Sequence, residues 1–146
     1  ESLRTPLAIR YPNGIQTIGP VKEMVQNIDF GPTLLDFAGI KVPSDMQGRS
    51  IKLVLEGTST DWRDAIYYHY YEYPNEHGVH KHYGIRTDRY KLMHFYEDID
   101  EWELFDLQED PNEMNNLYGQ REYEALVMEL KEGLVELQKV YRVDKF

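Results

Sequence analysis

Cysteine is absent from this 146-residue sequence, which excludes a disulfide framework and thiolate chemistry. No apolar run approaches the ~18 residues of a membrane-spanning helix, and no signal peptide is visible. Positive charge is scarce, since 16 Lys and Arg stand against 26 Asp and Glu and the formal net charge is −10. Because nucleic acids and membrane surfaces are themselves anionic, this balance argues against nucleic-acid or membrane binding. Affinity for an anionic ligand therefore requires a local cluster of cations.

An initiator methionine is also missing, because the chain opens with Glu1-Ser2-Leu3-Arg4-Thr5. We expect from this opening that the chain is a piece excised from a longer polypeptide. Its length is about that of one domain, and its hydrophobic content of 41% is ordinary for a globular protein. Tyrosine is over-used, with 12 residues, and Tyr-rich surfaces often face polar ligands or other proteins.

The first 60 residues predict a strand and a helix. Pro6–Pro12 is a short apolar run closed by a turn, which indicates a strand. Asp29 is a plausible N-cap for a helix that runs to Ala38 and ends at Gly39. Gly57–Thr60 has the composition of a linker, so we place a boundary there.

The second half predicts a small antiparallel sheet and a helix. Aromatic and β-branched residues mark four strands, with a tight turn at Asp88-Arg89 that makes a hairpin of the middle two. The predicted strands are Ala65–Tyr71, Tyr83–Thr87, Tyr90–Tyr96 and Glu103–Leu107. A stripe at helical spacing then predicts a helix that faces the core. Its members are Tyr123, Leu126, Val127, Leu130, Leu134, Leu137 and Val140 or Tyr141. The predicted class is α+β.

Five segments, in this order, together resemble the sulfatase family of the alkaline-phosphatase superfamily. They are Glu1–Leu7, Asn27–Gly39, Met46–Ser50, Tyr83–Leu92 and Glu103–Leu117, which are similar to the family's YEESLRVPL, DLAPTLLDLAG, QGRSL, GVRT..YKLI and ELYDLEKDPNE..NL motifs. Each motif alone is weak, but together they cover nearly the whole chain. The histidine-rich stretch between residues 69 and 82 most resembles the bacterial and lysosomal branch that acts on sulfated polysaccharides.

The resemblance implies a division into two parts. Residues 1–60 would be the C-terminal end of the α/β catalytic domain, a strand-helix remnant, and residues 61–146 would be the C-terminal subdomain. The intact protein would hydrolyse sulfate esters on sulfated sugars or glycosaminoglycans, in the periplasm, outside the cell or in the lysosome. The partners so implied are a sulfated carbohydrate and the missing catalytic domain.

The resemblance also places the catalytic groups upstream of this chain. Sulfatases use a formylglycine made from a Cys or Ser in a C/S-x-P/A-x-R motif, and a calcium ion that neutralises sulfate oxygens. No serine here begins such a motif. We therefore expect no catalytic residue, formylglycine, calcium ligand or other cofactor in this chain, and no activity from it alone. Its expected contribution is substrate recognition and packing.

Cations cluster in one segment of this acidic chain, and there we place the candidate substrate contacts. These are His77, His80, Lys81 and His82, with Tyr71 or Tyr73 stacking on a sugar ring. The alternative is a solvated loop followed by a polar strand face. Zinc is a weaker interpretation of the three histidines, because their spacing matches no standard zinc motif.

Other charged residues favour structural roles. Glu97–Glu101 lacks the central Gly and terminal Glu of an EF-hand loop, so we expect a solvated turn rather than a calcium site. Arg86 and Lys91 are expected to pair with carboxylates within the subdomain, and Arg49 to anchor a turn by a salt bridge.

Two rival functions remain open. One keeps the superfamily but changes the chemistry to phosphonate or phosphodiester hydrolysis. The other is a non-catalytic carbohydrate-binding or interaction module. If the chain is part of a larger domain, apolar side chains should be left uncovered and favour a homo-oligomer in isolation. The residues in question are Leu7, Ile9, Leu34, Leu35 and Phe37.

Overall fold

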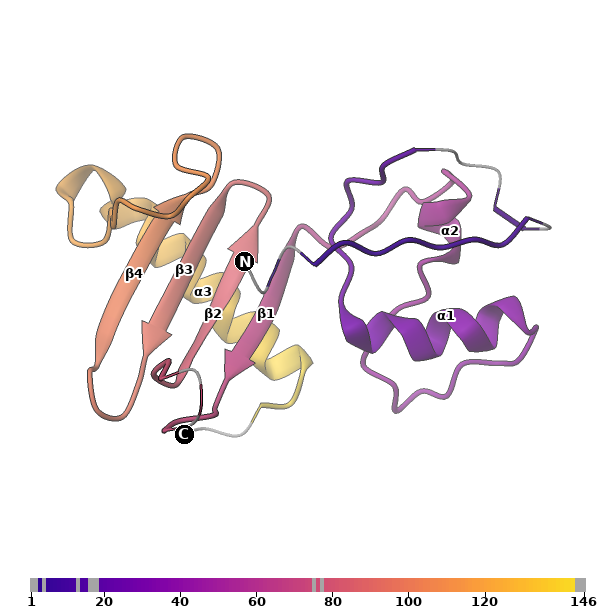
Figure 1. Ribbon diagram of the computed structural model, residues 1–146, viewed down its shortest axis with the longest axis horizontal. Coiled ribbons are helices and arrows are strands. Elements are labelled where there is room, and N and C mark those ends of the chain that lie inside the picture. Colours follow the sequence, from indigo (N-terminus) through magenta and orange to yellow (C-terminus); the bar gives the residue numbers. More distant parts are fainter. Residues whose placement is uncertain are drawn as a thin grey trace. The chain divides into compact units, whose positions relative to one another are not determined.

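The structure is a computed structural model that describes residues 3, 5–12, 14, 15, 19–74, 76 and 78–143. The chain divides into two compact units, an N-terminal unit, Glu1–Trp62, and a C-terminal unit, Arg63–Phe146 (Figure 1). Among the described residues, no helix has both the length and the apolar character needed to cross a membrane. The assignment of residues 1–60 and 61–146 to two parts of a sulfatase stays a prediction.

The N-terminal unit is organised around the buried carboxylate of Asp29. Its described residues form the 3-10 helix η1 (Asn27–Asp29) and the α-helices α1 (Phe30–Phe37) and α2 (Lys52–Leu55). The Asp29 carboxylate accepts hydrogen bonds from the backbone N–H groups of Gln26 and Arg49, each at 2.8 Å. These bonds compensate the cost of burying the charge and join the start of the helix to a loop 20 residues away.

Two further contacts hold the same loop against the helices. The Thr33 hydroxyl donates to the Asp29 carbonyl at 2.5 Å and accepts from the Ile51 N–H at 3.0 Å. Gly48 lies so close to the carbonyl of Ile28 that a side chain there would collide with it. The salt bridge predicted for Arg49 is confirmed, because its guanidinium lies 3.4 Å from the carboxylate of Asp61.

The strand predicted for Pro6–Pro12 is wrong, since residues 5–12 have no regular secondary structure. A strand needs a neighbour to accept and donate its backbone hydrogen bonds, and the described part of this unit contains no strand to pair with it. Apolar side chains are exposed nearby, including Leu7, Ile9 and Leu34, of which Leu34 is 70% exposed. Leu35 and Phe37 are half-buried, and homo-oligomer formation stays a prediction.

The C-terminal unit is a four-stranded antiparallel meander packed against one helix, so the α+β class is confirmed (Figure 1). The strands are β1 (Ala65–Tyr70), β2 (His82–Thr87), β3 (Tyr90–Phe95) and β4 (Glu101–Asp106), in the order β1-β2-β3-β4. The predicted hairpin turn at Asp88-Arg89 is confirmed, because Arg86 pairs with Lys91 across it. The 3-10 helix η2 (Arg121–Tyr123) leads into helix α3 (Glu124–Val140).

The core lies between α3 and one face of the sheet. Ile85, Leu92 and Leu104 stand opposite one another on three neighbouring strands and are at most 3% exposed. Leu130 and Leu134 of α3 pack on them, as the helical stripe predicts. At the end of the stripe, Val140 is exposed and Tyr141 stacks on Tyr67 instead.

The other face of the sheet carries the residues that alternate along each strand with the core residues. These residues are not all apolar. Tyr68, Gly84, Met93 and Glu103 are opposite one another across the four strands. A side chain at Gly84 would collide with the Leu92 carbonyl and the Tyr68 ring, so the glycine lets Tyr68 lie across β2. Burial raises the pKa of Glu103, and the positive charge of Lys91 opposes that shift.

Candidate functional site

Residues just before β2 lie against the turn that joins β3 to β4. The ladder between β2 and β3 extends past the strand ends, because the Tyr96 N–H donates to the Lys81 carbonyl at 3.2 Å. This pairing brings His80 and Lys81 next to residues 97–100, here called the acidic turn. Its three carboxylates are those of Glu97, Asp98 and Asp100.

Two of the four predicted contact residues make ion pairs with the acidic turn. His80 Nδ1 lies 2.8 Å from Asp98 Oδ2, and its ring stacks on Tyr73 with centroids 4.5 Å apart. Lys81 Nζ donates to the Glu97 carboxylate at 3.0 Å. This hydrogen bond raises the pKa of Lys81, so the side chain is cationic at neutral pH. Carboxylates of the same chain therefore contact both of these predicted residues.

His82 is placed differently from its two neighbours. It is the first residue of β2, and its ring stacks on Tyr70 on the sheet face turned away from α3. Its Nδ1 donates to the His80 carbonyl at 2.8 Å, because a carbonyl oxygen only accepts. His77, the fourth predicted residue, lies outside the described residues. Contact of these four residues with substrate stays a prediction.

Sequence reasoning missed an aromatic and histidine cluster on the α3 side of the sheet. His69 Nε2 lies 2.6 Å from the Tyr96 hydroxyl, and its ring meets Tyr67 and Tyr83 edge-on. Burial lowers the pKa of His69, with smaller contributions from the nearby charges of His82 and Lys81. The alternation of Tyr67 and His69 along β1, continued by Tyr71 just after it, was the available signal, since alternate residues of a strand share a face.

His94 completes this cluster at its β4 side. Its Nδ1 lies 3.0 Å from the Tyr83 hydroxyl and its Nε2 lies 2.8 Å from Asp100 Oδ1. The ring stacks on Trp102 at 4.3 Å, and Lys131 Nζ lies over the same indole at 4.0 Å. Both an imidazole ring and an ammonium group thus contact the Trp102 ring.

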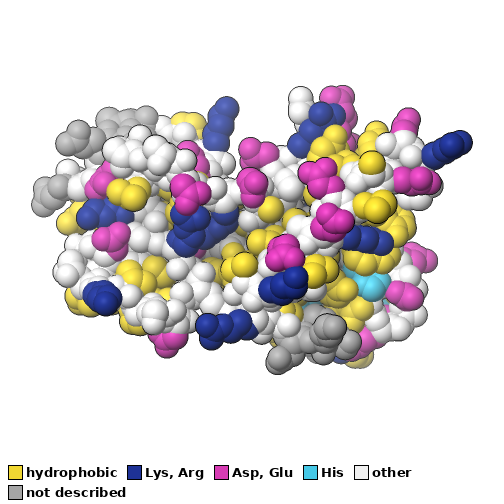
Figure 2. All heavy atoms as spheres, turned by 180° about the vertical axis from the view of Figure 1, so that it is seen from behind, with side chains coloured by type: hydrophobic (Ala, Val, Ile, Leu, Met, Phe, Trp, Pro, Cys, Tyr) yellow, Lys and Arg dark blue, Asp and Glu magenta, His cyan; other side chains and the backbone are white. Residues whose placement is uncertain are grey.

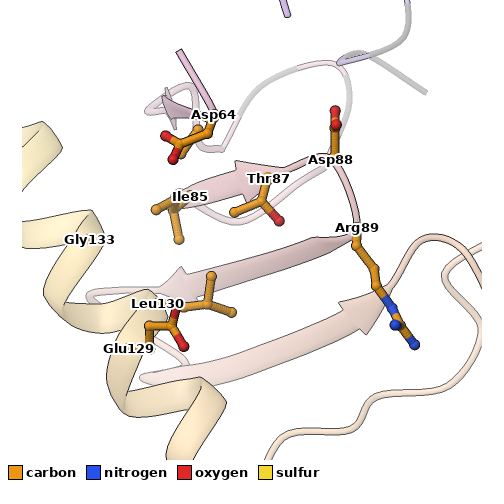
Figure 3. Close-up of a pocket in the computed structure, with 9 residues that line it drawn as sticks. Asp64, Ile85, Thr87, Asp88, Arg89, Glu129, Leu130 and Gly133 are labelled. Atoms are coloured by element: carbon orange, nitrogen blue, oxygen red, sulfur yellow. The ribbon is translucent and has the colours of Figure 1, made fainter. Parts of the chain in front are cut away.

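A separate hollow of about 440 Å³ lies at the opposite end of β2 (Figure 3). It is lined by Asp64, Ala65, Ile85, Thr87, Asp88, Arg89, Glu129, Leu130 and Gly133. Three of these side chains are carboxylates, and the Arg89 guanidinium is held by Asp106 at 2.7 Å. Such a rim favours cations over anions such as sulfate. Figure 2 shows acidic and basic side chains interspersed on the surface behind the view of Figure 1.

The remaining charged residues have structural roles where the structure defines them. Lys91 is buried and pairs with Glu113, which confirms the ion pair predicted for it. For Arg86 the same prediction stays a prediction. Within the described ranges, no group of three or more His, Asp or Glu side chains is arranged to hold a metal ion.

Comparison with known proteins shows what this fold is similar to. Residues 1–140 match the family described as N-sulphoglucosamine sulphohydrolase, C-terminal. An N-acetylglucosamine-6-O-sulfatase of Bacteroides thetaiotaomicron is 55% identical over 145 residues, which are 97% of this chain and 26% of that protein. An arylsulfatase of Clostridium perfringens is 34% identical over 77% of this chain and 22% of its own length.

A solved structure has the same fold over most of this chain. It is that of a protein in complex with its substrate D-glucosamine-2-N,6-O-disulfate, and it matches with a TM-score of 0.89 and 54% identity. The match covers 93% of this chain and 28% of the other. The chain thus spans about a quarter of the length of these relatives. By its sequence and its fold, the chain belongs to the sulfatase family, in the group of N-sulphoglucosamine sulphohydrolase C-terminal domains.

Proposed function

We propose that the chain is the C-terminal part of a sulfatase that hydrolyses sulfate esters on a sulfated amino sugar of the glycosaminoglycan type. The observation that carries the proposal is the likeness, at 54% identity over 93% of the chain, to a protein whose substrate is a disulfated glucosamine. Localisation outside the cytoplasm, in the periplasm, the medium or a lysosome, is part of the proposal because glycosaminoglycans are found there.

The chain's own contribution is recognition of the anionic substrate. His80 and Lys81 are two nitrogen-bearing side chains at consecutive positions in a chain of net charge −10, and the Tyr73 ring stacks on the ring of His80. Charge-assisted hydrogen bonds from such a pair suit a sulfate or carboxylate group. The proposal also assigns substrate contacts to His77 and His82, and Tyr71, which is 68% exposed, offers a ring for stacking on a sugar.

The chemical step requires groups from elsewhere in the longer polypeptide. A formylglycine nucleophile and a calcium ion would supply the attack on sulfur and the charge neutralisation. With zero cysteines, this chain has none from which formylglycine could be made. Residues 1–60 would complete the catalytic domain and residues 61–146 would form the subdomain beside it. Alone, the 146-residue chain should be inactive.

Activity of the longer polypeptide tests the proposal. The gene product that contains this chain should release sulfate from glucosamine 6-sulfate, and the chain alone should release none. Hydrolysis of a phosphonate monoester or a phosphodiester in preference to the sulfate ester would favour the rival chemistry. A native polypeptide that begins at Glu1 and binds sugars without hydrolysing them would establish the binding-module alternative.

A further inference from the structure

Every carboxylate of the acidic turn meets a base from a neighbouring strand or loop. The three pairs are Lys81–Glu97 at 3.0 Å, His80–Asp98 at 2.8 Å and His94–Asp100 at 2.8 Å. In the first two pairs, the carboxylates contact Lys81 and His80, which are the residues that the proposed function assigns to substrate binding. The third lies on the other side of the turn and occupies a histidine of the aromatic cluster.

The turn holds two of these acids in a backbone conformation that side chains disfavour. Glu97 has φ 74° and Asp100 has φ 52°, in the left-handed region that glycine adopts without cost. For a long side chain such as Glu, this conformation costs conformational free energy. A glycine at position 97 would relieve that cost but would remove the carboxylate that meets Lys81. The Glu97 side chain is therefore the functional part of this position.

The Lys81–Glu97 and His80–Asp98 pairs lie at the surface, so each can separate without transferring a charge into the core. The side chains of Glu97 and Asp98 are 54% and 44% exposed, and those of their partners Lys81 and His80 are 25% and 34% exposed, so both members of each pair keep contact with water when the pair opens. The buried pair of Lys91 and Glu113 contrasts with them, because its side chains are only 11% and 24% exposed. Breaking that pair would separate a buried ammonium from the Glu113 carboxylate.

We infer that Glu97 and Asp98 are specificity-determining residues, which occupy Lys81 and His80 as internal anions until a ligand anion displaces them. A sulfate group is charged and can accept from Lys81 or His80 in place of the carboxylate, whereas a neutral hydroxyl cannot compete with a carboxylate. The turn thereby rejects neutral sugars, since their binding would leave the two carboxylates in place. This inference rests on the proposed role of His80 and Lys81 in substrate binding.

Sulfate titration of the full chain tests the inference. Sodium sulfate is added at constant ionic strength, and the NMR signals of the His80 ring and the Lys81 side chain report the apparent Kd. In the double variant Glu97→Gln, Asp98→Asn the Kd should fall about five- to tenfold, because two competing surface pairs are removed. The matched control is Asp100→Asn, which removes the third carboxylate of the turn and should leave the Kd unchanged.

Three outcomes would overturn the inference. These are an unchanged Kd in the double variant, an equal change in Asp100→Asn, and no sulfate binding by any variant. Adding Lys81→Met to the double variant should abolish the gain, and circular dichroism checks that each variant is folded. If the double variant does not fold, Glu97→Gln and Asp98→Asn measured singly carry the test, each with a smaller decrease in Kd.

Failure of the inference is distinguishable from failure of the proposed function. A longer polypeptide that releases no sulfate from glucosamine 6-sulfate would refute the function, whatever the sulfate affinity of the double variant. If the longer polypeptide is a functional sulfatase but the double variant has the same Kd for sulfate as the wild type, only the inference is refuted.

Discussion

The Arg89 guanidinium binds the Asp106 carboxylate through three hydrogen bonds of 2.7 to 3.2 Å, and so connects the β2–β3 turn to the end of β4. The same carboxylate accepts from the backbone N–H groups of Gln108 and Glu109. The Asp106 side chain thus orders the turn that follows β4. Through this turn the chain continues toward η2 and α3.

Replacement of Asp106 by Asn should weaken the C-terminal unit and change its response to acid. The hydrogen bond from Arg89 lowers the pKa of Asp106, so its contribution is fully present above the carboxyl's unfolded pKa. That contribution is lost as the pH falls through the lower, folded pKa. Thermal unfolding at pH 7 should show a melting temperature roughly 5 °C lower in Asp106→Asn. Below about pH 4 the difference between the two proteins should begin to shrink, and it should vanish only below the folded pKa of Asp106, so a constant gap would contradict the assignment.

Leu92→Ala should lower the free energy of unfolding by about 2–5 kcal/mol, because it leaves a cavity at the centre of the sheet. Leu92 is 0% exposed and contacts the row formed by Ile85 and Leu104. Urea denaturation measures the change. Met128→Ala on the outer face of α3, where Met128 is 65% exposed, is the control and should change stability by less than about 0.5 kcal/mol.

Gly48→Ala should destabilise the N-terminal unit by roughly 1–3 kcal/mol, since the added methyl group would overlap the Ile28 carbonyl. The backbone must then move apart and strain the Arg49 N–H bond to Asp29. Gly31→Ala is the matched control, because an alanine Cβ at that α1 position meets nothing closer than 3.8 Å. We expect the control to be neutral or stabilising, as Ala is favoured over Gly in helices. Equal effects at the two glycines would refute this explanation.

Stability should fall on mild acidification because of His69. Its folded pKa is lowered by burial, so the unfolded state binds the proton more readily. The contribution is present above the unfolded pKa of about 6.5 and is lost as the pH falls through the folded pKa. Denaturation at pH 7.5 and pH 5.0 should show a smaller loss in His69→Gln than in the wild type. An identical loss would assign the pH dependence to other groups.

Lys81→Met in the longer polypeptide should reduce kcat/KM for a sulfated sugar by about tenfold, mainly through KM, because one charge-assisted hydrogen bond to the substrate is lost. Lys139→Met is the control. Lys139 lies on the outer face of α3 and pairs only locally with Glu136 at 2.6 Å, so its loss should leave the rate unchanged. A normal KM in Lys81→Met would exclude Lys81 from the substrate site.

Much of the C-terminal unit follows from local pattern. The alternation around Ile85 and Leu92 predicts strands, and the stripe through Leu130 and Leu134 predicts the helix, since each pattern has one buried face. The strand expected at Pro6–Pro12 failed for the converse reason. Its apolar run is compatible with a strand, but pairing is a property of the neighbouring chain and not of the run itself.

The sequence by itself determined the α+β class, the family resemblance and the clustering of His80 and Lys81 in an acidic chain. Only the tertiary structure decided what those cations touch. The antiparallel register places residues 16 to 18 positions later beside them, and so selects Glu97 and Asp98 as their partners. The separation of residues in the sequence carries no information on such contacts, because they depend on the register between β2 and β3. The aromatic cluster around His69 was hidden for the same reason.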